Sequence, residues 1–555
     1  MEGGQLVEIP LTVLGTLGAV APESEMVLVR LEAERFKQTG VIAGMSGSPV
    51  YVDGRLLGAL AVGWPFATEP IAGVTPFSRM QQLASPATAG GGEGRTSSSL
   101  ELEEIVGAWR DGTLDQLVLS RLFPEPSSRA TNSLQQPVTL AAGGLGPPCA
   151  WLEEGWQRLG WVSTPGGAGD APTTDEIVPG SMVAGIMVAG DATVAVGGTV
   201  TEVRGDQLWA LGHPFLGGGS FAFPLARARV VAVLPSSFSS AKLFEVGEVV
   251  GALEVDRAHG VWGRLGDAPP MVDVAVEASG ESYSFQCVRH PVLFPILLGY
   301  LTHASHGARG RVFGDQTLGV RLEISYRGMP EIVFEETYSG ADAPAMAAAL
   351  VSAVMAYLEG SSFVVPEVDS VRVRIEAVET IERAHVVDVV PDRPRVRAGE
   401  SLDVRVRLRR HRGDVETRQV RLQVPPEVVP GPLDLVVADG ISWAAYDLQM
   451  RPSRPASFAD EVEFLNRLVP STHLVMVFER QDVGVTLPGA RVAVPPSVFL
   501  TLRSGLGSNL GMTSYRVVSK HDEVLPYPVL GAQRVSLIVH QDGSGLAAAE
   551  QSEGS

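Results

Sequence analysis

The chain has few cysteines, and their scarcity excludes two kinds of stabilised scaffold. Cys149 and Cys287 are the only two among 555 residues. Two cysteines cannot build a disulfide framework or a four-thiolate zinc site. They could form one disulfide, but we expect two buried free thiols instead.

Positive charge and long apolar runs are also in short supply. Lys and Arg number 43 against 63 Asp and Glu, which gives a net charge of −20. This balance argues against general nucleic-acid binding and against docking on an anionic membrane. No stretch reaches the roughly 18 apolar residues of a membrane span. The nearest, 343–360, is short and Ala-rich and predicts a packed helix.

What the chain does have is turn residues and alternating strands. It contains 62 Gly and 39 Pro, with hydrophobic residues at 45%. Residues 5–80 and 180–335 are rich in short Val- and Gly-containing strands, with a D-G turn at Asp53-Gly54. This texture predicts a mainly β fold with several domains.

Changes in composition predict the domain boundaries. The Gly- and Ser-rich stretch 85–99 and the stretch 164–174 are typical of linkers. Residues 366–435 alternate apolar with charged residues at period two, which favours an Ig-like sandwich. We expect a capping box at Ser457 and Asp460 to begin a helix that runs to about Leu468. The predicted units are 1–84, 85–175 (linker and insert, with a helix at 101–109), 176–335, 336–365 (helix and connector), 366–435, 436–540 (mixed α/β) and a disordered tail at 541–555.

The sharpest motif is 44-GMSGSP-49, between two predicted strands. A nucleophilic serine needs a tight turn, a base within reach and backbone N–H groups around the developing oxyanion. The pattern G-x-S-G-x-P is similar to that of chymotrypsin-like proteases. It assigns Ser46 as nucleophile and the N–H groups of Gly44 and Ser46 as oxyanion hole. Ser48 is the weaker candidate, and an ordinary Gly/Ser hairpin loop is the alternative.

Among ten histidines, His213 is the best candidate base. It follows a strand–turn–strand pattern, 197-GGTVTEVRGDQLWALGHPF-215, and a base at a strand end is held rigidly. Taken alone, the residue could equally cap a turn. His303 and His306 have the spacing of a metal pair, but no nearby Asp, Glu or Cys completes a site. Gly217–Gly219 lack the Lys-Ser/Thr of a phosphate loop. We therefore expect neither metal nor cofactor.

Together the two segments resemble the stage IV sporulation protein B peptidases, serine peptidase family 55. That family has a G-M-S-G-S-P loop followed by a strand pair, and a G-T-x-T…A-L-G-H segment that carries the histidine. The counterparts here are 40–64 and 198–215, with further similarity at 228–237 and 247–266. The resemblance covers roughly residues 5–80 and 180–300, about a third of the chain.

The resemblance has three departures. In that family the histidine segment precedes the serine segment, whereas here Ser46 comes first, as in a circular permutation. The family's acidic residue precedes the serine at a D-P-R-L-L segment, and its alignment on 32–40 places Glu32 there, with Glu34 as alternative. Glu32 could equally be a solvated turn carboxylate. The family's PDZ domain is not visible.

The resemblance implies a chymotrypsin-like double barrel, permuted. Between its halves we expect an inserted helical or irregular segment, and after it the C-terminal Ig-like domains that the alternation predicts. It implies a serine endopeptidase with Ser46, His213 and Glu32 as its triad, acting on a protein or peptide. Trp64, Phe215 and Leu216 would line the substrate cleft. The alternative is a catalytically inactive scaffold or binding module of the cell envelope.

The N-terminus indicates nothing firm about location. MEGGQLVEIPLTVLG lacks the basic and apolar regions of a signal peptide. We expect an exported protein if the native N-terminus precedes Met1 and a cytoplasmic one otherwise. The sequence does not predict an oligomeric state.

Overall fold

The computed structural model describes most of the chain: residues 6–18, 25–64, 67–84, 100–123, 138–169, 176–236, 240–309, 311, 314–450, 455–480, 484–487, 490–493, 497–498, 501, 511–513 and 516–540. The predicted linker at 85–99, residues 170–174 of the one at 164–174 and the predicted tail lie outside these residues.

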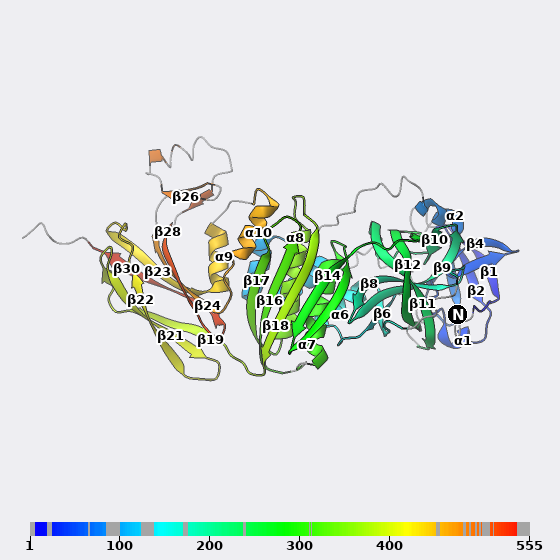
Figure 1. Cartoon of the computed structure of the whole chain (residues 1–555), viewed down its shortest axis with the longest axis horizontal. Helices are drawn as coiled ribbons and strands as arrows, with labels where there is room; N and C mark the ends of the chain where they lie inside the picture. The colour runs from blue at the N-terminus through cyan, green and yellow to red at the C-terminus, as the bar shows by residue number, and fades with distance from the viewer. Residues whose placement is uncertain are drawn as a thin grey trace, which may run out of the picture.

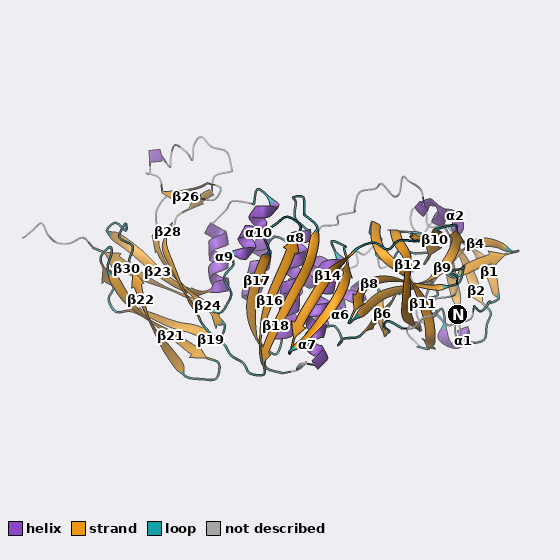
Figure 2. Ribbon diagram, viewed as in Figure 1, coloured by secondary structure: helices purple, strands orange, loops and turns teal. Residues whose placement is uncertain are grey.

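The molecule is elongated, with its sheets arranged in a row (Figure 1). The N-terminal sheet lies at one end, a large sheet backed by helices lies in the middle, and the C-terminal sheets lie at the other end (Figure 2). Most of its elements are strands. The mainly β class predicted from the turn-rich composition is therefore confirmed.

The serine motif belongs to a five-stranded antiparallel sheet of order β1-β2-β5-β4-β3. Asp53 and Gly54 turn β3 into β4 with positive φ angles of 50° and 74°, as the D-G signal predicts. The expected strand at the start of 41–64 is absent, because residues 41–48 form a loop with a single bridge at Ala43. The elements are β1 (Leu11–Leu17), β2 (Met26–Leu31), α1 (Phe36–Thr39), β3 (Pro49–Val52), β4 (Arg55–Gly63), β5 (Ile71–Pro76), α2 (Phe77–Met80) and the 3₁₀ helix η1 (Gln81–Ala84).

The histidine segment belongs to six strands that close into a ring. They follow the order β8-β11-β12-β13-β10-β9, and β9 pairs back onto β8. The first seven residues of β8 and the first nine of β9 are buried without alternation, as expected for strands covered on both faces. The strands are β8 (Met182–Gly190), β9 (Thr193–Arg204), β10 (Gln207–Ala210), β11 (Gly219–Leu234), β12 (Ala241–Arg257) and β13 (Gly260–Leu265).

The ring continues on both sides into a 13-stranded sheet. One extension runs from β8 through β15 (Glu281–Val288), β14 (Met271–Ala278), β18 (Val368–Val378) and β16 (Gln316–Tyr326) to β17 (Ile332–Gly340). The other runs from β9 to β6 (Val138–Gly143) and β7 (Trp161–Pro165). The insert expected to be helical or irregular thus contributes two strands to the main sheet.

Helices pack with this sheet around one large apolar core. They are α4 (Leu102–Asp111), α5 (Leu114–Leu122), α6 (Ala150–Arg158), α7 (Leu293–Arg309) and α8 (Ala343–Glu359). The predicted helix at 343–360 is confirmed as α8, whose first sixteen residues are all buried save Ala345. None of the helices in the described ranges is both long and apolar enough to cross a membrane. Cys149 and Cys287 are buried free thiols, as expected.

The C-terminal part contains two sheets that share an apolar core. The sequence prediction was wrong at its start, because β18 pairs with β14 and β16 of the main sheet rather than with a sandwich. One sheet contains β19 (Ala384–Pro391), β21 (Ser401–Arg410), β22 (Val415–Gln423) and β29 (Val529–Leu530). The other contains β20 (Arg395–Val396), β23 (Gly431–Asp439), β24 (His473–Arg480), β28 (Arg516–Val524) and β30 (Ala532–Val539).

Smaller elements complete this part. A short sheet contains β25 (Gly484–Leu487), β26 (Ala490–Ala493) and β27 (Gly511–Thr513), and α9 spans Gly440–Met450. The helix α10 (Phe458–Asn466) begins where the capping signal predicts. The Ser457 side chain accepts a hydrogen bond from the N–H of Asp460.

Candidate active site

The loop that carries Ser46 is held against the ring by backbone hydrogen bonds on both sides of the serine. The N–H of Ala43 donates to the carbonyl of Ser240 at 2.7 Å, and the N–H of Lys242 donates back to Ala43 at 3.0 Å. On the other side, the N–H of Thr199 donates to the carbonyl of Ser46 at 2.9 Å. The N–H of Gly47 donates to the carbonyl of Leu60 on β4 at 2.8 Å. The five-stranded sheet and the ring therefore fix the nucleophile loop together.

Two glycines permit this close approach. Gly44 and Gly47 have positive φ angles of 90° and 95°, a region that favours glycine. A Cβ on Gly47 would lie 1.8 Å from the carbonyl oxygen of Thr199 on β9. The glycine after the serine is thus required by contact with the ring as well as by its own backbone angle.

The histidine is presented by a turn at the end of β10. Leu211 and Gly212 both have positive φ, 66° and 72°, so the chain reverses before His213. A left-handed leucine carries backbone strain of about 1–3 kcal/mol, and such strain is common at functional sites. The hydroxyl of Thr75 on β5 donates to the Gly212 carbonyl at 2.7 Å. The serine-bearing sheet therefore also holds the histidine turn.

Ser46 and His213 form a hydrogen-bonded pair. The Oγ of Ser46 lies 2.8 Å from Nε2 of His213, although 167 positions separate them in the chain. The proximity expected from the sequence is confirmed. Both residues are almost completely buried, at 2% and 3% exposure. Burial lowers the pKa of His213, which favours the neutral imidazole that a general base requires.

A backbone carbonyl orients the imidazole. Nδ1 of His213 lies 2.8 Å from the carbonyl oxygen of Pro214. A carbonyl can only accept, so Nδ1 carries the proton and Nε2 is left to accept from the Ser46 hydroxyl. This is the tautomer that a Ser-His pair needs.

The structure does not bring Glu32 or Glu34 to the histidine. Glu32 accepts a hydrogen bond from Nε of Arg30 at 3.3 Å, and Glu34 pairs with Lys37 at 2.7 Å. Both are surface carboxylates, with side chains 39% and 85% exposed. The assignment of Glu32 as the acid therefore fails on geometry: β2 ends at Leu31, and the carboxylate turns to a neighbouring arginine on the surface.

A buried carboxylate that the motif search missed holds the segment after the histidine. Asp256 on β12 accepts hydrogen bonds from the N–H groups of Phe215 (2.7 Å), Leu216 (2.6 Å) and Gly217 (2.8 Å). Asp256 is 1% exposed, and burial raises its pKa to about 6. It fixes the loop that supplies Pro214 without touching the imidazole.

A buried lysine, also missed, lies under the serine loop. Nζ of Lys242 donates to the Gly44 carbonyl at 2.7 Å and to Oγ1 of Thr199 at 3.2 Å. The hydroxyl of Thr199 donates to the same carbonyl at 2.9 Å. Desolvation by burial lowers the lysine's pKa to about 8. Lys242 thus binds the serine loop at two points, with its side chain at the Gly44 carbonyl and with its backbone N–H at the Ala43 carbonyl.

One of the two predicted oxyanion donors, the N–H of Gly44, belongs to the loop that Lys242 holds. Among the described residues, the N–H of Gly44 has no hydrogen-bond partner. It is therefore available to a developing oxyanion. The carbonyl of the same peptide group, on Ala43, accepts from the Lys242 N–H. That bond polarises and orients the Gly44 N–H.

Residues predicted to line a substrate cleft do not all lie on the surface. Phe215 is 5% exposed and stacks on Trp161 with ring centres 5.2 Å apart, so it belongs to the core. Leu216 is half-buried and Trp64 is partly exposed. His306, considered above as half of a metal pair, instead shares a hydrogen bond of 3.1 Å with the Gln316 side chain.

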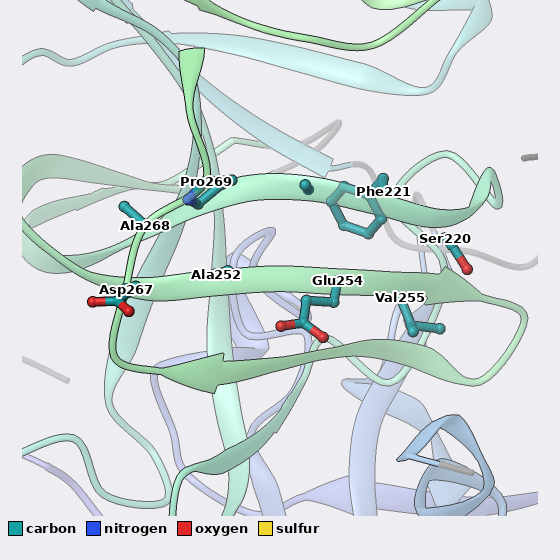
Figure 3. A pocket seen from close by; sticks show the side chains of 9 residues that line it. Ser220, Phe221, Ala252, Glu254, Val255, Asp267, Ala268 and Pro269 are labelled. Atoms are coloured by element: carbon teal, nitrogen blue, oxygen red, sulfur yellow. The ribbon is translucent and has the colours of Figure 1, made fainter. Parts of the chain in front are cut away.

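Two cavities lie near the histidine loop, and neither lining includes Ser46 or His213. One, of about 410 Å³, is lined by residues from β11 and β12 and by the segment from Asp267 to Pro269. Figure 3 shows its side chains spread along the two strands. Its Glu254 is paired with Arg264 at 3.0 Å. The second cavity lies beside Gly217 and Gly219.

No family model, no curated protein and no solved structure matches the chain.

Proposed function

We propose that this protein is a serine endopeptidase similar to the stage IV sporulation protein B peptidases. The observation that carries the proposal is the 2.8 Å contact between Ser46 Oγ and His213 Nε2, with Nδ1 protonated toward Pro214. We assign the five-stranded sheet and the six-stranded ring to the two halves of a permuted chymotrypsin-like fold. The two C-terminal sheets would be its Ig-like accessory part.

The reaction follows from this pair. His213 Nε2 takes the Ser46 proton as Oγ bonds to the peptide carbonyl carbon, and the Gly44 N–H stabilises the oxyanion. The C–N bond then breaks, and the leaving amine takes the proton from Nε2. Water hydrolyses the acyl-enzyme with the same histidine as base. The Pro214 carbonyl keeps its hydrogen bond to Nδ1–H throughout, in the place where a triad has a carboxylate.

Two features favour an inactive scaffold as second candidate. The imidazolium that forms during the reaction would face a neutral carbonyl rather than a charged acid, which stabilises it less. The pair is also almost inaccessible to solvent. An inactive protein would keep the fold and bind peptides without cleaving them.

Labelling with a fluorophosphonate probe separates the two candidates. The wild-type protein should be labelled covalently at Ser46. Ser46→Ala should abolish labelling, and His213→Ala should slow it by at least about a thousandfold, because the base is lost. Ser48→Ala is the matched control and should retain the label. Wild-type protein that stays unlabelled, or a label that survives in Ser46→Ala, would contradict the peptidase assignment.

A further inference from the structure

The second cavity is lined by basic groups from both halves of the site. It measures about 330 Å³, at the small end of the range for ligand pockets. Arg79 and Gln82 come from α2 and η1. Gly217 comes from the loop after His213, and Gly219 begins β11. Arg257 ends β12, and His259 lies in the turn that follows it. The cavity therefore lies where the serine-bearing part meets the ring.

The charge of this cavity opposes that of the molecule. The chain carries a net charge of −20, yet the cavity lining contains two arginines and a histidine and no carboxylate. Within the described residues Arg79 makes no ion pair. The nearest acid along the chain is Asp256, whose oxygens already accept three backbone N–H groups. The lining of the cavity is thus locally basic on an acidic protein, which favours an anionic ligand there.

Its walls are continuous with the elements that hold the catalytic pair. Gly217, in the wall, donates its N–H to Asp256, which anchors the loop after His213. Arg79 and Gln82 belong to the segment that directly follows β5 in the chain, and Thr75 on β5 donates a hydrogen bond to the carbonyl of Gly212. The cavity is therefore built from segments that adjoin the histidine turn, since His259 also precedes Gly260, which packs against the backbone of Gly212.

We propose that this cavity is a specificity subsite that binds the carboxylate of an acidic side chain in a peptide substrate. The inference rests on the proposed peptidase function and names its substrate class. A guanidinium presents two parallel N–H donors that match a carboxylate. A cavity of this size holds about one side chain with its flanking backbone. An acidic substrate residue would thereby be recognised against its neutral amide.

Binding to the inert Ser46→Ala protein tests the subsite without cleavage. The ligands are fluorescent alanine-based heptapeptides with Glu, Gln or Lys at the central position, measured by fluorescence anisotropy. We expect the Glu peptide to bind about tenfold more tightly than the Gln peptide, a difference of about 1.4 kcal/mol. Equal affinity for all three peptides, or no binding at millimolar peptide, would overturn the subsite.

Variants then assign the effect to this cavity. Arg79→Gln, made on the Ser46→Ala background, should remove most of the preference for Glu, and Arg79→Lys should keep part of it. Arg79→Glu should shift the preference toward the Lys peptide. The matched control is Arg55→Gln, which removes an exposed arginine at the β3–β4 turn outside the cavity. A Glu preference that survives Arg79→Glu would place the recognition elsewhere and overturn the proposal.

Two further measurements distinguish a free anion from a peptide carboxylate as the ligand, and failure of the subsite from failure of the peptidase function. If inorganic phosphate binds to this cavity while the peptides do not discriminate, the cavity serves a free anion and the peptide proposal fails. If the wild-type protein is labelled by fluorophosphonate but shows no Glu preference, the subsite fails and the peptidase stands. A Glu preference without labelling leaves the subsite on a non-catalytic peptide-binding protein.

Discussion

Two buried ionisable residues, Lys242 and Asp256, support the candidate site from opposite sides. Lys242 binds the Gly44 carbonyl under the serine loop, and Asp256 binds the three N–H groups after the histidine. Neither contacts the reacting atoms in this structure. Both are positioning residues, and each has a pKa displaced by burial.

The lysine makes stability depend on pH. Its pKa is about 8 in the folded protein, below the ordinary 10.5, so the fold disfavours its cation. This cost is fully present below pH 8 and disappears as pH rises from about 8 to 10.5, up to about 3 kcal/mol. The free energy of unfolding of the wild type should therefore rise relative to that of Lys242→Met across this interval. Urea unfolding of both proteins at pH 7 and pH 10 measures this difference in the free energy of unfolding. A difference that is the same at both pH values would contradict the prediction.

Because Asp256 holds the loop after His213, its substitution should change the rate at which Ser46 is labelled. Asp256→Asn places an amide NH₂ where a carboxylate oxygen accepts backbone N–H groups. We expect fluorophosphonate labelling at pH 8 to slow by about tenfold or more. The ratio of the wild-type labelling rate to that of Asp256→Asn should fall as pH falls through about 6. Near that pH the wild-type carboxyl becomes protonated and, like the amide, uncharged. Glu254→Gln, on the same strand, is the control, and a gap independent of pH would refute the role.

The sequence predicts the reacting pair better than its supports. Ser46 and His213 are flanked by glycines in recognisable motifs, and their hydrogen bond is confirmed. Lys242 and Asp256 have no local signature, because their burial depends on segments far away in the chain. Only the resemblance assigns Glu32. In the structure its carboxylate accepts a hydrogen bond from Arg30, two residues earlier.

At the scale of elements, the serine loop fits against β9 with no spare room. Gly47→Ala would put a methyl group 1.8 Å from the Thr199 carbonyl, so the loop or the strand must move. We expect a loss of about 2–4 kcal/mol in the free energy of unfolding and at least about a hundredfold slower labelling. Thermal unfolding and probe kinetics measure both.

Gly54→Ala is the matched control for that substitution. Gly54 also has a positive φ, 74°, but a Cβ there meets nothing within 4 Å. Gly54→Ala should lower the free energy of unfolding only by the cost of a left-handed alanine, about 1 kcal/mol. It should leave the rate of labelling unchanged. If the two substitutions behave alike, the contact with Thr199 is not the reason for Gly47.

Sequence periodicity predicts elements more reliably than it assigns them to sheets. The alternation in 368–378 correctly indicates a half-exposed strand, but β18 joins the main sheet rather than the C-terminal sheets. The pattern reports which face is buried, whereas the partner depends on distant strands. The same limit explains β6 and β7, which lie in the insert for which the sequence predicts only helical or irregular structure.

At the scale of the whole molecule, a buried acid joins the main sheet to the C-terminal part. Glu336 on β17 accepts hydrogen bonds from the N–H and hydroxyl of Ser471, just before β24. Burial raises the pKa of Glu336 to about 8. Its folded pKa lies above the ordinary 4.5, so its contribution to stability is full below pH 4.5 and is lost as pH rises through 8.

This joint should loosen as pH rises. Limited proteolysis between the main sheet and the C-terminal sheets should become faster from pH 5 to pH 8.5 in the wild type. Glu336→Gln should remove that dependence, because its amide does not ionise. The neighbouring Glu335, a surface carboxylate paired with Arg321, supplies the control Glu335→Gln. Identical pH profiles for wild type and Glu336→Gln would show that the joint is insensitive to this carboxyl.

The burial of Ser46 and His213 has a consequence for the kinetics of covalent modification. We expect a reagent to reach Oγ during motions that uncover it, in which case the observed rate of covalent modification does not exceed the frequency of those motions. At low reagent concentration the rate should rise in proportion to concentration, and at high concentration it should level off at a value common to chemically different reagents. That plateau measures how often this molecule opens.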